Sequence, residues 1–284
     1  MAVVEGIDTA RGVAALIGRA RFEVIPLDGI EEQVLEHVPR DVTLTVAASP
    51  TKGLEPTFDL VERLVAHGYT AVPHLSARLV RDRAHLAELL DRSRALGLED
   101  VFVVAGDATE SGAFHGAAAL LDAMAGLGHP FSEVGITGYP ESHPFIDDGT
   151  TIQAMFDKAR YATYIVSQVC FDPRVTVQWI ESVWARGTRL PILVGVPGVV
   201  SRAKLLRVST QIGIGDSLRF LRTHGSFASR FLHGGFSPDP LVDGLAPLLN
   251  DPKRKLAGFH VFTFNDVAGA ARWRVGRLRR EGLL

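Results

Sequence analysis

The feature that most constrains the fold is a repeated unit made of a short apolar run, a loop, a segment with helical spacing and a glycine. Such apolar runs, rich in Val, Ile, Leu and Phe, recur along the chain and predict eight strands: 21–27, 42–49, 70–77, 100–106, 133–140, 164–171, 190–197 and 259–264. Continuous apolar strands that alternate with helices are typical of a parallel sheet covered on both faces. Eight such units in about 250 residues favour a closed (β/α)8 TIM barrel.

The segments between these runs carry helix boundaries. Asp82 and Asp172 are predicted N-caps, and Pro173 stands at the first helical position after Asp172. An additional helix is expected at about residues 9–19, ahead of the first strand. The stretch 198–258 is longer than one crossover needs and predicts extra helices between strands 7 and 8. No linker divides the chain, so residues 1–284 are expected to form a single domain.

An open, doubly wound sheet is the alternative architecture. It is disfavoured because no G-x-G-x-x-G follows the first strand. The nearest glycine pair, at 212–216, comes late in the chain and between two predicted helices.

Composition excludes several classes of function. The net charge is −2 and the basic residues are scattered, so neither a nucleic-acid nor an anionic-membrane surface is expected. The longest apolar run has 11 residues, well short of the roughly 20 that a membrane helix requires. The N-terminus lacks a basic leader, and the lone cysteine, Cys170, forbids an internal disulfide. We therefore expect a cytoplasmic protein that binds a small neutral or anionic ligand; its oligomeric state is not indicated.

Active sites of TIM barrels lie where the carboxyl ends of the strands meet. Polar residues on or just after the predicted strands are therefore the candidate site residues: Glu23, Thr45, His74, Asp107, Tyr139, His143, Gln168, Asn265 and Asp266.

Glu23 is the most informative of these candidates, because an ionised carboxylate inside a barrel is costly unless it is paired. Burial raises the pKa of a carboxyl group, and an acid that stays neutral near pH 7 can donate a proton. The structural alternatives are that Glu23 pairs with Arg21 or faces the helices.

Each remaining candidate also has a structural interpretation. Asp107 follows Gly106 at a strand end and could cap a turn. His74 could be a core histidine, and Gln168 could bond the barrel backbone. Tyr139 and His143 lie in a proline-containing loop beyond strand five.

Other chemistries are less well supported. No HExxH occurs and no convergent pattern of histidines and carboxylates is apparent, so no metal site is expected. A glycosidase-like pair of Glu23 and Asp107 would need an aromatic lining, yet all three tryptophans fall on predicted helices. Schiff-base chemistry is disfavoured because the lysines avoid the strand interiors.

The candidate residues belong to motifs that resemble the methylenetetrahydrofolate reductase family in order and in strand position over about residues 20–282. These motifs are FEVIP with Glu23, LT (44–45), PHL (73–75), GD (106–107), GYPESHP (138–144), SQVCFD (167–172), GVPGV (195–199) and FHVFTFN (259–265). GYPExHP together with Q-x-x-FD and FHxxTxN is a fairly specific combination.

The resemblance implies a (βα)8 barrel that reduces 5,10-methylenetetrahydrofolate to 5-methyltetrahydrofolate with electrons from a nicotinamide nucleotide, NADH in our expectation. It implies that Glu23 is the general acid and that Asp107 also takes part in catalysis. The folate would be held by Asp107, Gln168 and Asn265, and the cofactor site would be lined by Thr45, His74, Tyr139, His143 and Lys158. The ring that bridges N5 and N10 must open to an N5 iminium cation before hydride adds, and opening needs a proton on N10.

The cofactor positions depart from the family pattern. Where FAD-binding relatives commonly carry polar or basic anchors, this sequence has Ala105, Ala154 and Asp157, with only Lys158 retained. A diphosphate needs charge-assisted donors, so tightly bound FAD is doubtful and direct hydride transfer from NADH is expected. The alternatives are an FAD-dependent reductase of the same substrate and a barrel that binds reduced folate without catalysis.

Overall fold

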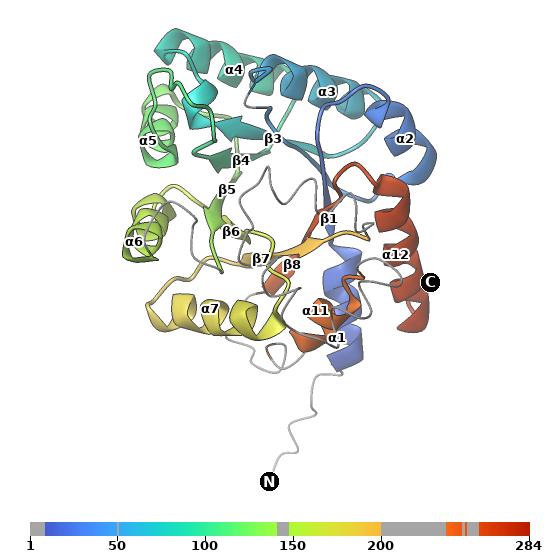
Figure 1. The fold of residues 1–284 in the computed structure, drawn as a ribbon. Helices are drawn as coiled ribbons and strands as arrows, with labels where there is room; N and C mark the ends of the chain where they lie inside the picture. The colour runs from blue at the N-terminus through green and yellow to red at the C-terminus, as the bar shows by residue number, and fades with distance from the viewer. Residues whose placement is uncertain (1–8, 50, 141–147, 200–236, 246–247, 249–255) are drawn as a thin grey trace.

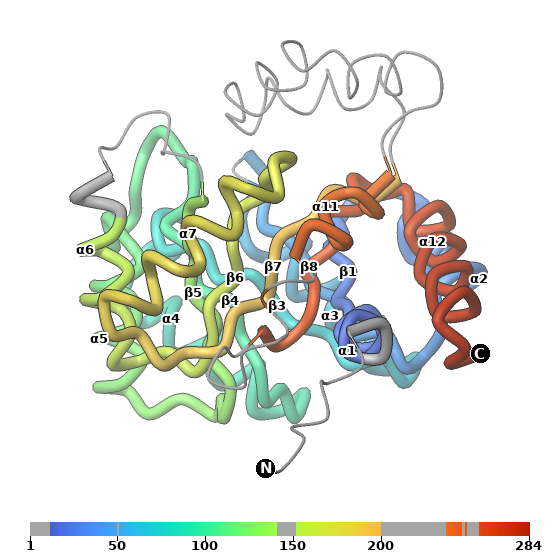
Figure 2. Tube along the Cα trace, turned by 90° about the horizontal axis from the view of Figure 1, so that it is seen from below, coloured from blue at the N-terminus to red at the C-terminus, as the bar shows by residue number. Residues whose placement is uncertain are grey.

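The computed structural model describes residues 9–49, 51–140, 148–199, 237–245, 248 and 256–284, without the side chains of 9–11 and 148–151. Eight parallel strands hydrogen-bond in chain order, and the last pairs with the first, so the sheet closes on itself. Figure 1 shows the strands at the centre with the helices around them, and Figure 2 shows the same arrangement from a perpendicular direction. The predicted (β/α)8 TIM barrel is confirmed.

All eight predicted strands are present, though most are shorter than the apolar runs: β1 (Arg21–Val24), β2 (Leu44–Val46), β3 (Ala71–Ser76), β4 (Asp100–Val104), β5 (Glu133–Gly138), β6 (Tyr164–Ser167), β7 (Ile192–Pro197) and β8 (Leu256–Phe262). The first strand ends early for a specific reason. The carboxamide of Asn265 accepts from the backbone N–H of Ile25 at 2.8 Å and donates to the carbonyl of Ile25 at 2.9 Å. These two bonds take the place of backbone hydrogen bonds to a neighbouring strand.

The described helices are α1 (Thr9–Gly18), α2 (Ile30–His37), α3 (Glu55–Ala66), the 3-10 turn η1 (Ala77–Leu79), α4 (Arg83–Ala95), α5 (Ala117–Leu127), α6 (Asp148–Ala159), α7 (Pro173–Ala185), α11 (Asp239–Gly244) and α12 (Val267–Arg280). Both predicted caps are confirmed: Asp82 accepts from the backbone of His85 and Asp172 from that of Arg174, each at 2.8 Å. The N-terminal helix is also confirmed, and it packs against β8 and α12.

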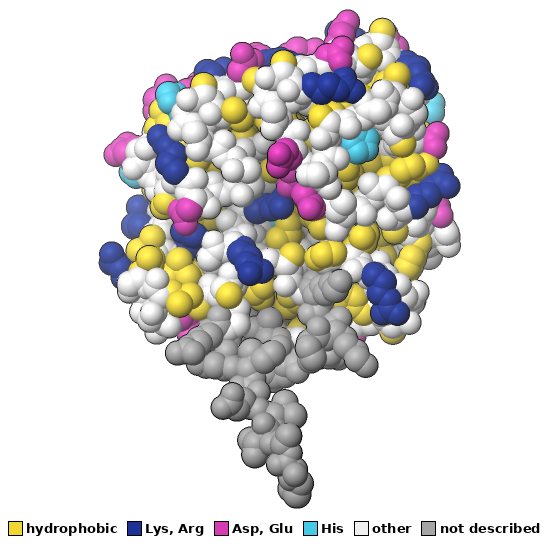
Figure 3. Space-filling view, turned by 180° about the vertical axis from the view of Figure 1, so that it is seen from behind, with side chains coloured by type: hydrophobic (Ala, Val, Ile, Leu, Met, Phe, Trp, Pro, Cys, Tyr) yellow, Lys and Arg dark blue, Asp and Glu magenta, His cyan; other side chains and the backbone are white. Residues whose placement is uncertain are grey.

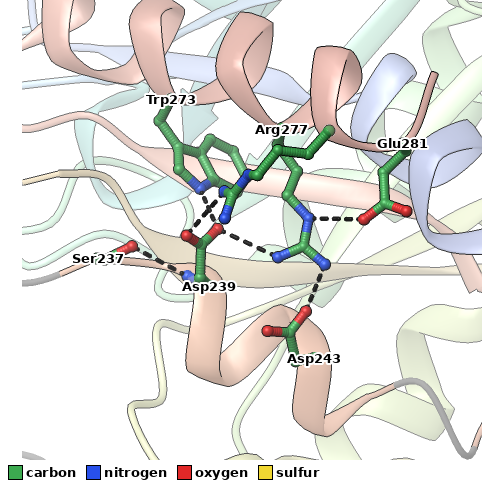
Figure 4. A network of polar contacts seen from close by, with 7 residues as sticks. Ser237, Asp239, Asp243, Trp273, Arg277 and Glu281 are labelled. Carbon is green, nitrogen blue, oxygen red and sulfur yellow. Dashed lines mark hydrogen bonds and ion pairs between the residues drawn. The ribbon is translucent and has the colours of Figure 1, made fainter. Parts of the chain in front are cut away.

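The connection from β7 to β8 contains α11, which supports the prediction of extra helical structure there; residues 200–236 lie outside the described part of the chain. A polar network fastens α11 to α12 (Figure 4). Asp239 accepts from the indole of Trp273 at 2.8 Å and from Arg277 at 3.3 Å, and Arg277 also bonds Asp243 and Glu281. These pairs hold α11 against α12, the helix that follows β8.

The lower interior of the barrel is filled in two layers. Arg21, Asp100 and Tyr164 stand at the first positions of β1, β4 and β6, and the Arg21 guanidinium contacts the Asp100 carboxylate at 2.7 Å and the Tyr164 hydroxyl at 2.9 Å. An apolar layer contains Val72, Phe102, Val166 and Leu193. The barrel is therefore a packed core below its carboxyl-terminal mouth.

The outer surface carries both signs of charge. Figure 3 shows lysines and arginines interspersed with carboxylates on one face. Within the described part of the chain, no helix combines the length and the apolar character needed to cross a bilayer.

Replacing Asp82 with alanine removes the side-chain acceptor at the start of α4. We expect the free energy of unfolding to fall by about 1 kcal/mol in urea denaturation. Asp91→Ala is the matched control on the same helix, because its pair with Arg94 is solvent-exposed and should contribute less than about 0.5 kcal/mol. Equal effects of the two substitutions would contradict the capping role.

Candidate active site

Glu23 lies inside the barrel, as the sequence predicts for a site residue. Its Oε2 is 3.0 Å from Nε2 of His260 on β8 and 3.7 Å from Nε2 of His74 on β3, and 16% of its side chain is exposed. Arg21 is not its partner, because that guanidinium is bound to Asp100 and Tyr164. Both structural alternatives for Glu23, a pair with Arg21 and an orientation toward the helices, are therefore excluded.

Two histidines and two aromatic rings surround this carboxyl group. His260 is fully buried and His74 is 6% exposed. The His74 ring packs edge-on against Phe102, and the His260 ring against Phe262, each with 4.8 Å between centroids. The site therefore combines a polar centre with apolar walls, which strengthens the electrostatic interactions inside it.

The expected rise in the pKa of Glu23 is wrong for the free protein. Burial does raise the pKa, but the hydrogen bond with His260 and the electrostatic interactions with His74 and His260 outweigh burial, so the pKa lies below its ordinary value. The same burial, opposed only in part by the Glu23 carboxylate, lowers the pKa of His74 to about 4. His74 is therefore neutral near pH 7, and His260 is the partner that favours the ionised carboxyl group.

The sequence analysis also missed a convergence of potential metal ligands. Glu23, His74 and His260 bring one ligand atom each within 4.8 Å of one another. They come from β1, β3 and β8, so no spacing in the sequence reveals them. Oε2 and Nε2 at 3.0 Å are at hydrogen-bond distance, closer than the roughly 3.4 Å that separates the ligands of a tetrahedral ion with bonds of about 2.1 Å. We therefore interpret the cluster as a hydrogen-bonded group.

Three buried polar atoms next to Glu23 have no hydrogen-bond partner among the described residues: Thr45 Oγ1, His74 Nε2 and His260 Nδ1. Thr45 is paired in register with Glu23, which places both side chains on the interior face. Buried polar atoms are normally satisfied, by protein, water or ligand. This group therefore marks a place where a polar ligand or water can bind.

Asp107 follows β4 and is exposed at the mouth. Gly106 before it has φ +85°, and a Cβ at this position would lie 1.8 Å from the hydroxyl of Ser76. Only glycine allows this approach of the β4 loop to β3, and the loop in turn sets the position of the Asp107 backbone.

Tyr139, Thr137 and Lys158 form a second polar group above β5. Lys158 donates to the Thr137 hydroxyl at 3.3 Å and is 7% exposed. Burial raises the pKa of Tyr139 and the nearby charge of Asp107 adds to the rise, although a hydrogen bond with Thr137 opposes it. The structure thus brings three predicted site residues, Asp107, Tyr139 and Lys158, to one side of the mouth; His143 lies outside the described residues.

Gln168 and Asn265 differ in how much hydrogen-bonding capacity they retain. The carbonyl oxygen of Gln168 accepts from the backbone N–H of Val169 at 2.9 Å. The carboxamide of Asn265 both accepts from and donates to the backbone of Ile25, so neither its oxygen nor its nitrogen is without a partner. The backbone of Asn265 is left-handed, with φ 60°. Asp266 caps α12 through the backbone N–H of Gly269 at 3.0 Å. Asn265 therefore positions the loop after β1, and its role as a folate ligand stays a prediction.

The positions predicted to lack flavin anchors are at the surface. Ala105, Ala154 and Asp157 are exposed, and Asp157 accepts from Gln153 on the same helix at 2.8 Å. The neighbouring Lys158 turns inward to Thr137. None of the four positions Ala105, Ala154, Asp157 and Lys158 presents an exposed cation, so these residues do not supply the charge-assisted donors that a tightly held FAD needs.

His260 lies in this candidate site although the sequence did not single it out. It belongs to the FHVFTFN motif but was not chosen as a candidate. A histidine within an apolar strand is the same signal that selected His74, so it could have been found. Thr263, which donates to the backbone carbonyl of Glu23 at 2.5 Å, has no comparable signal.

Lys158→Met should stabilise the protein. Burial lowers the pKa of Lys158 from 10.5 to about 8, so the folded state binds its proton less tightly than the unfolded chain does. The stability of the native protein should therefore rise with pH between about 8 and 10.5, and this rise should be absent in the variant. At pH 7 we expect a gain of roughly 1–3 kcal/mol in urea denaturation.

Lys52→Met at an exposed position is the control and should change stability by less than about 0.5 kcal/mol. A loss of stability in Lys158→Met at pH 7 would contradict a buried amine that has a hydroxyl partner but no carboxylate partner among the described residues.

Comparisons with known proteins agree with this picture of the fold. The sequence profile described as methylenetetrahydrofolate reductase matches residues 30–215, well over half of the chain. Among solved structures, the chain is similar to oxaloacetate acetylhydrolase in complex with the inhibitor 3,3-difluorooxalacetate, with a TM-score of 0.52 and 11% identity over 98% of this chain and 89% of that chain. A second structure of oxaloacetate acetylhydrolase matches with the same values. At this identity the likeness concerns the fold alone. The profile match identifies the chain as a member of the methylenetetrahydrofolate reductase family.

Proposed function

We propose that this protein reduces 5,10-methylenetetrahydrofolate to 5-methyltetrahydrofolate by hydride transfer from NADH, with Glu23 as the general acid. The observation that carries the proposal is the position of Glu23, whose carboxyl group is enclosed in the barrel of a reductase-family protein and hydrogen-bonded to His260. A carboxyl group that is hydrogen-bonded to His260 and keeps 16% of its side chain exposed can still reach a substrate from the mouth.

The chemistry requires the site first to donate a proton to N10 and then to stabilise a positive charge at N5. In the substrate complex the ligand removes the remaining solvent from the Glu23 carboxyl group and raises its pKa. Protonated Glu23 then gives its proton to N10, the bond from N10 to the bridging carbon breaks with its electron pair staying on N10, and an iminium cation forms at N5. Asp107, exposed at the mouth, stabilises this cation electrostatically, while Gln168 and Asp107 hold the pterin. Hydride from NADH then adds to the iminium carbon.

The nicotinamide ring is proposed to occupy the space beside Thr45, His74 and Tyr139. Support for direct transfer comes from the exposed residues Ala105, Ala154 and Asp157, which offer no cation for the diphosphate of a flavin. Thr45 and His74 each have a buried polar atom without a partner among the described residues, and such atoms can bond a ligand placed there.

The purified protein should show no flavin absorbance and should oxidise NADH when methylenetetrahydrofolate is added. The physical reason is the missing charge-assisted anchor for a diphosphate. A visible spectrum followed by stopped-flow measurement of NADH and NADPH oxidation checks this. Stoichiometric FAD that is required for turnover would establish the flavin-dependent alternative instead.

Glu23→Gln should lower kcat by roughly 10²-fold or more, because the amide has the shape of the acid but does not donate its proton to N10. The affinity for 5-methyltetrahydrofolate, measured by calorimetry, should change much less. Glu88→Gln on the exposed face of α4 is the control. Unchanged turnover in Glu23→Gln would show that Glu23 is not the general acid. A native protein that binds reduced folate but does not oxidise NADH would support the alternative of a non-catalytic folate-binding barrel.

A further inference from the structure

We propose that Arg78 is a positioning residue that fixes the place of Asp107 at the mouth of the barrel. It acts on the backbone of the loop that follows β4. The effect on catalysis rests on the proposed function, in which Asp107 stabilises a cation and holds the pterin. The contact between Arg78 and the loop does not rest on it, because this contact is a feature of the free protein.

The two ends of the loop after β4 lie against the segment that follows β3. The backbone N–H of Arg78 donates to the carbonyl of Ala105, and the carbonyl of Arg78 accepts from the N–H of Gly112, each at 3.0 Å. A Cβ on Gly112 would lie 2.1 Å from the carbonyl oxygen of Val80, so only glycine allows this approach. The stretch between these two ends contains Asp107 and is held by a side chain.

The side chain of Arg78 holds the middle of the loop. Its Nε donates to the carbonyl of Ala108 at 2.6 Å, and its Nη2 donates to the carbonyl of Thr109 at 2.9 Å. These are the two residues that directly follow Asp107. Ala108 is 9% exposed, and a buried carbonyl that loses its donor is costly. A guanidinium suits this task, because its donors form a fixed fork and its charge strengthens each bond.

The contacts of Arg78 leave the charge of Asp107 available to a ligand. Both guanidinium bonds go to carbonyl oxygens, so Arg78 orients the loop without using the Asp107 carboxylate as its acceptor. An arginine bonded directly to that carboxylate would offset its charge and weaken its attraction for a cation on the substrate. Arg78 therefore sets where the carboxylate stands, and Asp107 interacts with the ligand.

Arg81 lies on the same segment and provides a matched comparison. Its side chain is 65% exposed and faces Glu55 on α3 at 4.0 Å and Glu88 on α4 at 3.8 Å. Its backbone carbonyl accepts from the N–H of Ala113 at 2.9 Å, a bond that a change of side chain keeps. Removing the Arg81 side chain therefore breaks exposed ion pairs and no bond to the loop after β4.

Hydrogen exchange of the free protein, followed by NMR, tests the contact without substrate. We expect the amides of Gly112 and Ala113 to exchange at least about tenfold faster in Arg78→Ala than in the native protein, because the loop opens more readily once its middle is released. Arg81→Ala should exchange at the native rate. Unchanged exchange in Arg78→Ala would overturn the proposal.

The kinetic test is a double-mutant cycle with Asp107→Asn. In the native background, Arg78→Ala should lower kcat roughly 10-fold, because a displaced carboxylate stabilises the cation less well. In the Asp107→Asn background, the same substitution should lower kcat less than about 2-fold, because no charge is left to position. Arg81→Ala should keep kcat within about 2-fold in both backgrounds.

Equal losses of kcat in the two backgrounds would overturn the proposal, since Arg78 would then support the fold and not Asp107. If Arg78→Ala does not fold, Arg78→Lys takes its place in both tests. Lysine keeps the charge but lacks the fork of donors, so the same results are expected to a smaller degree.

A native protein that binds reduced folate without turnover would contradict the proposed function and leave this proposal testable. The cycle is then measured on the affinity for 5-methyltetrahydrofolate by calorimetry. An effect of Arg78→Ala that disappears in the Asp107→Asn background would support the positioning role, and additive effects would overturn it.

Discussion

The pairing of β1 with β8 is the interaction on which the rest of this site depends. It joins segments from opposite ends of the chain and sets Arg21 opposite His260 and Glu23 opposite Phe262. Because paired residues of neighbouring strands point to the same face, closure of the barrel turns all of these side chains inward. Glu23 and His260 can form their 3.0 Å contact only when the barrel is closed, so folding and assembly of the site are the same event.

The barrel separates two sets of charges that would otherwise interfere. At its lower end Arg21 and Asp100 form an ion pair at 2.7 Å. Above them the apolar side chains of Val72, Phe102, Val166 and Leu193 fill the interior. Because the guanidinium is held by Asp100 and Tyr164, Glu23 contacts the imidazoles of His74 and His260 instead. A permanent cation beside Glu23 would hold it ionised and oppose the transfer of a proton to substrate.

The mouth divides into a side with one carboxyl group and two histidines and a side with a carboxylate and a lysine. Glu23, His74 and His260 come from β1, β3 and β8, whereas Asp107 and Lys158 lie near β4 and β5. Lys158 is buried with a hydroxyl partner, and its pKa of about 8 leaves it only a modest preference for the charged form at neutral pH. Ala105, Ala154 and Asp157 carry no positive charge, so these positions depart from the family pattern in electrostatics as well.

The sequence by itself determined the barrel, because apolar runs, helical spacing and caps such as Asp82 and Asp172 are local properties of the chain. It also singled out Glu23, since a carboxyl group in an apolar strand is costly wherever that strand packs. Only the tertiary structure decided the partners of these residues. It brought His260 on β8 into contact with Glu23 on β1, which sets the direction of the Glu23 pKa shift, and it placed the carboxamide of Asn265 against the backbone of Ile25. Partners and electrostatics depend on distances between residues far apart in the sequence, and these distances exist only once the barrel has closed.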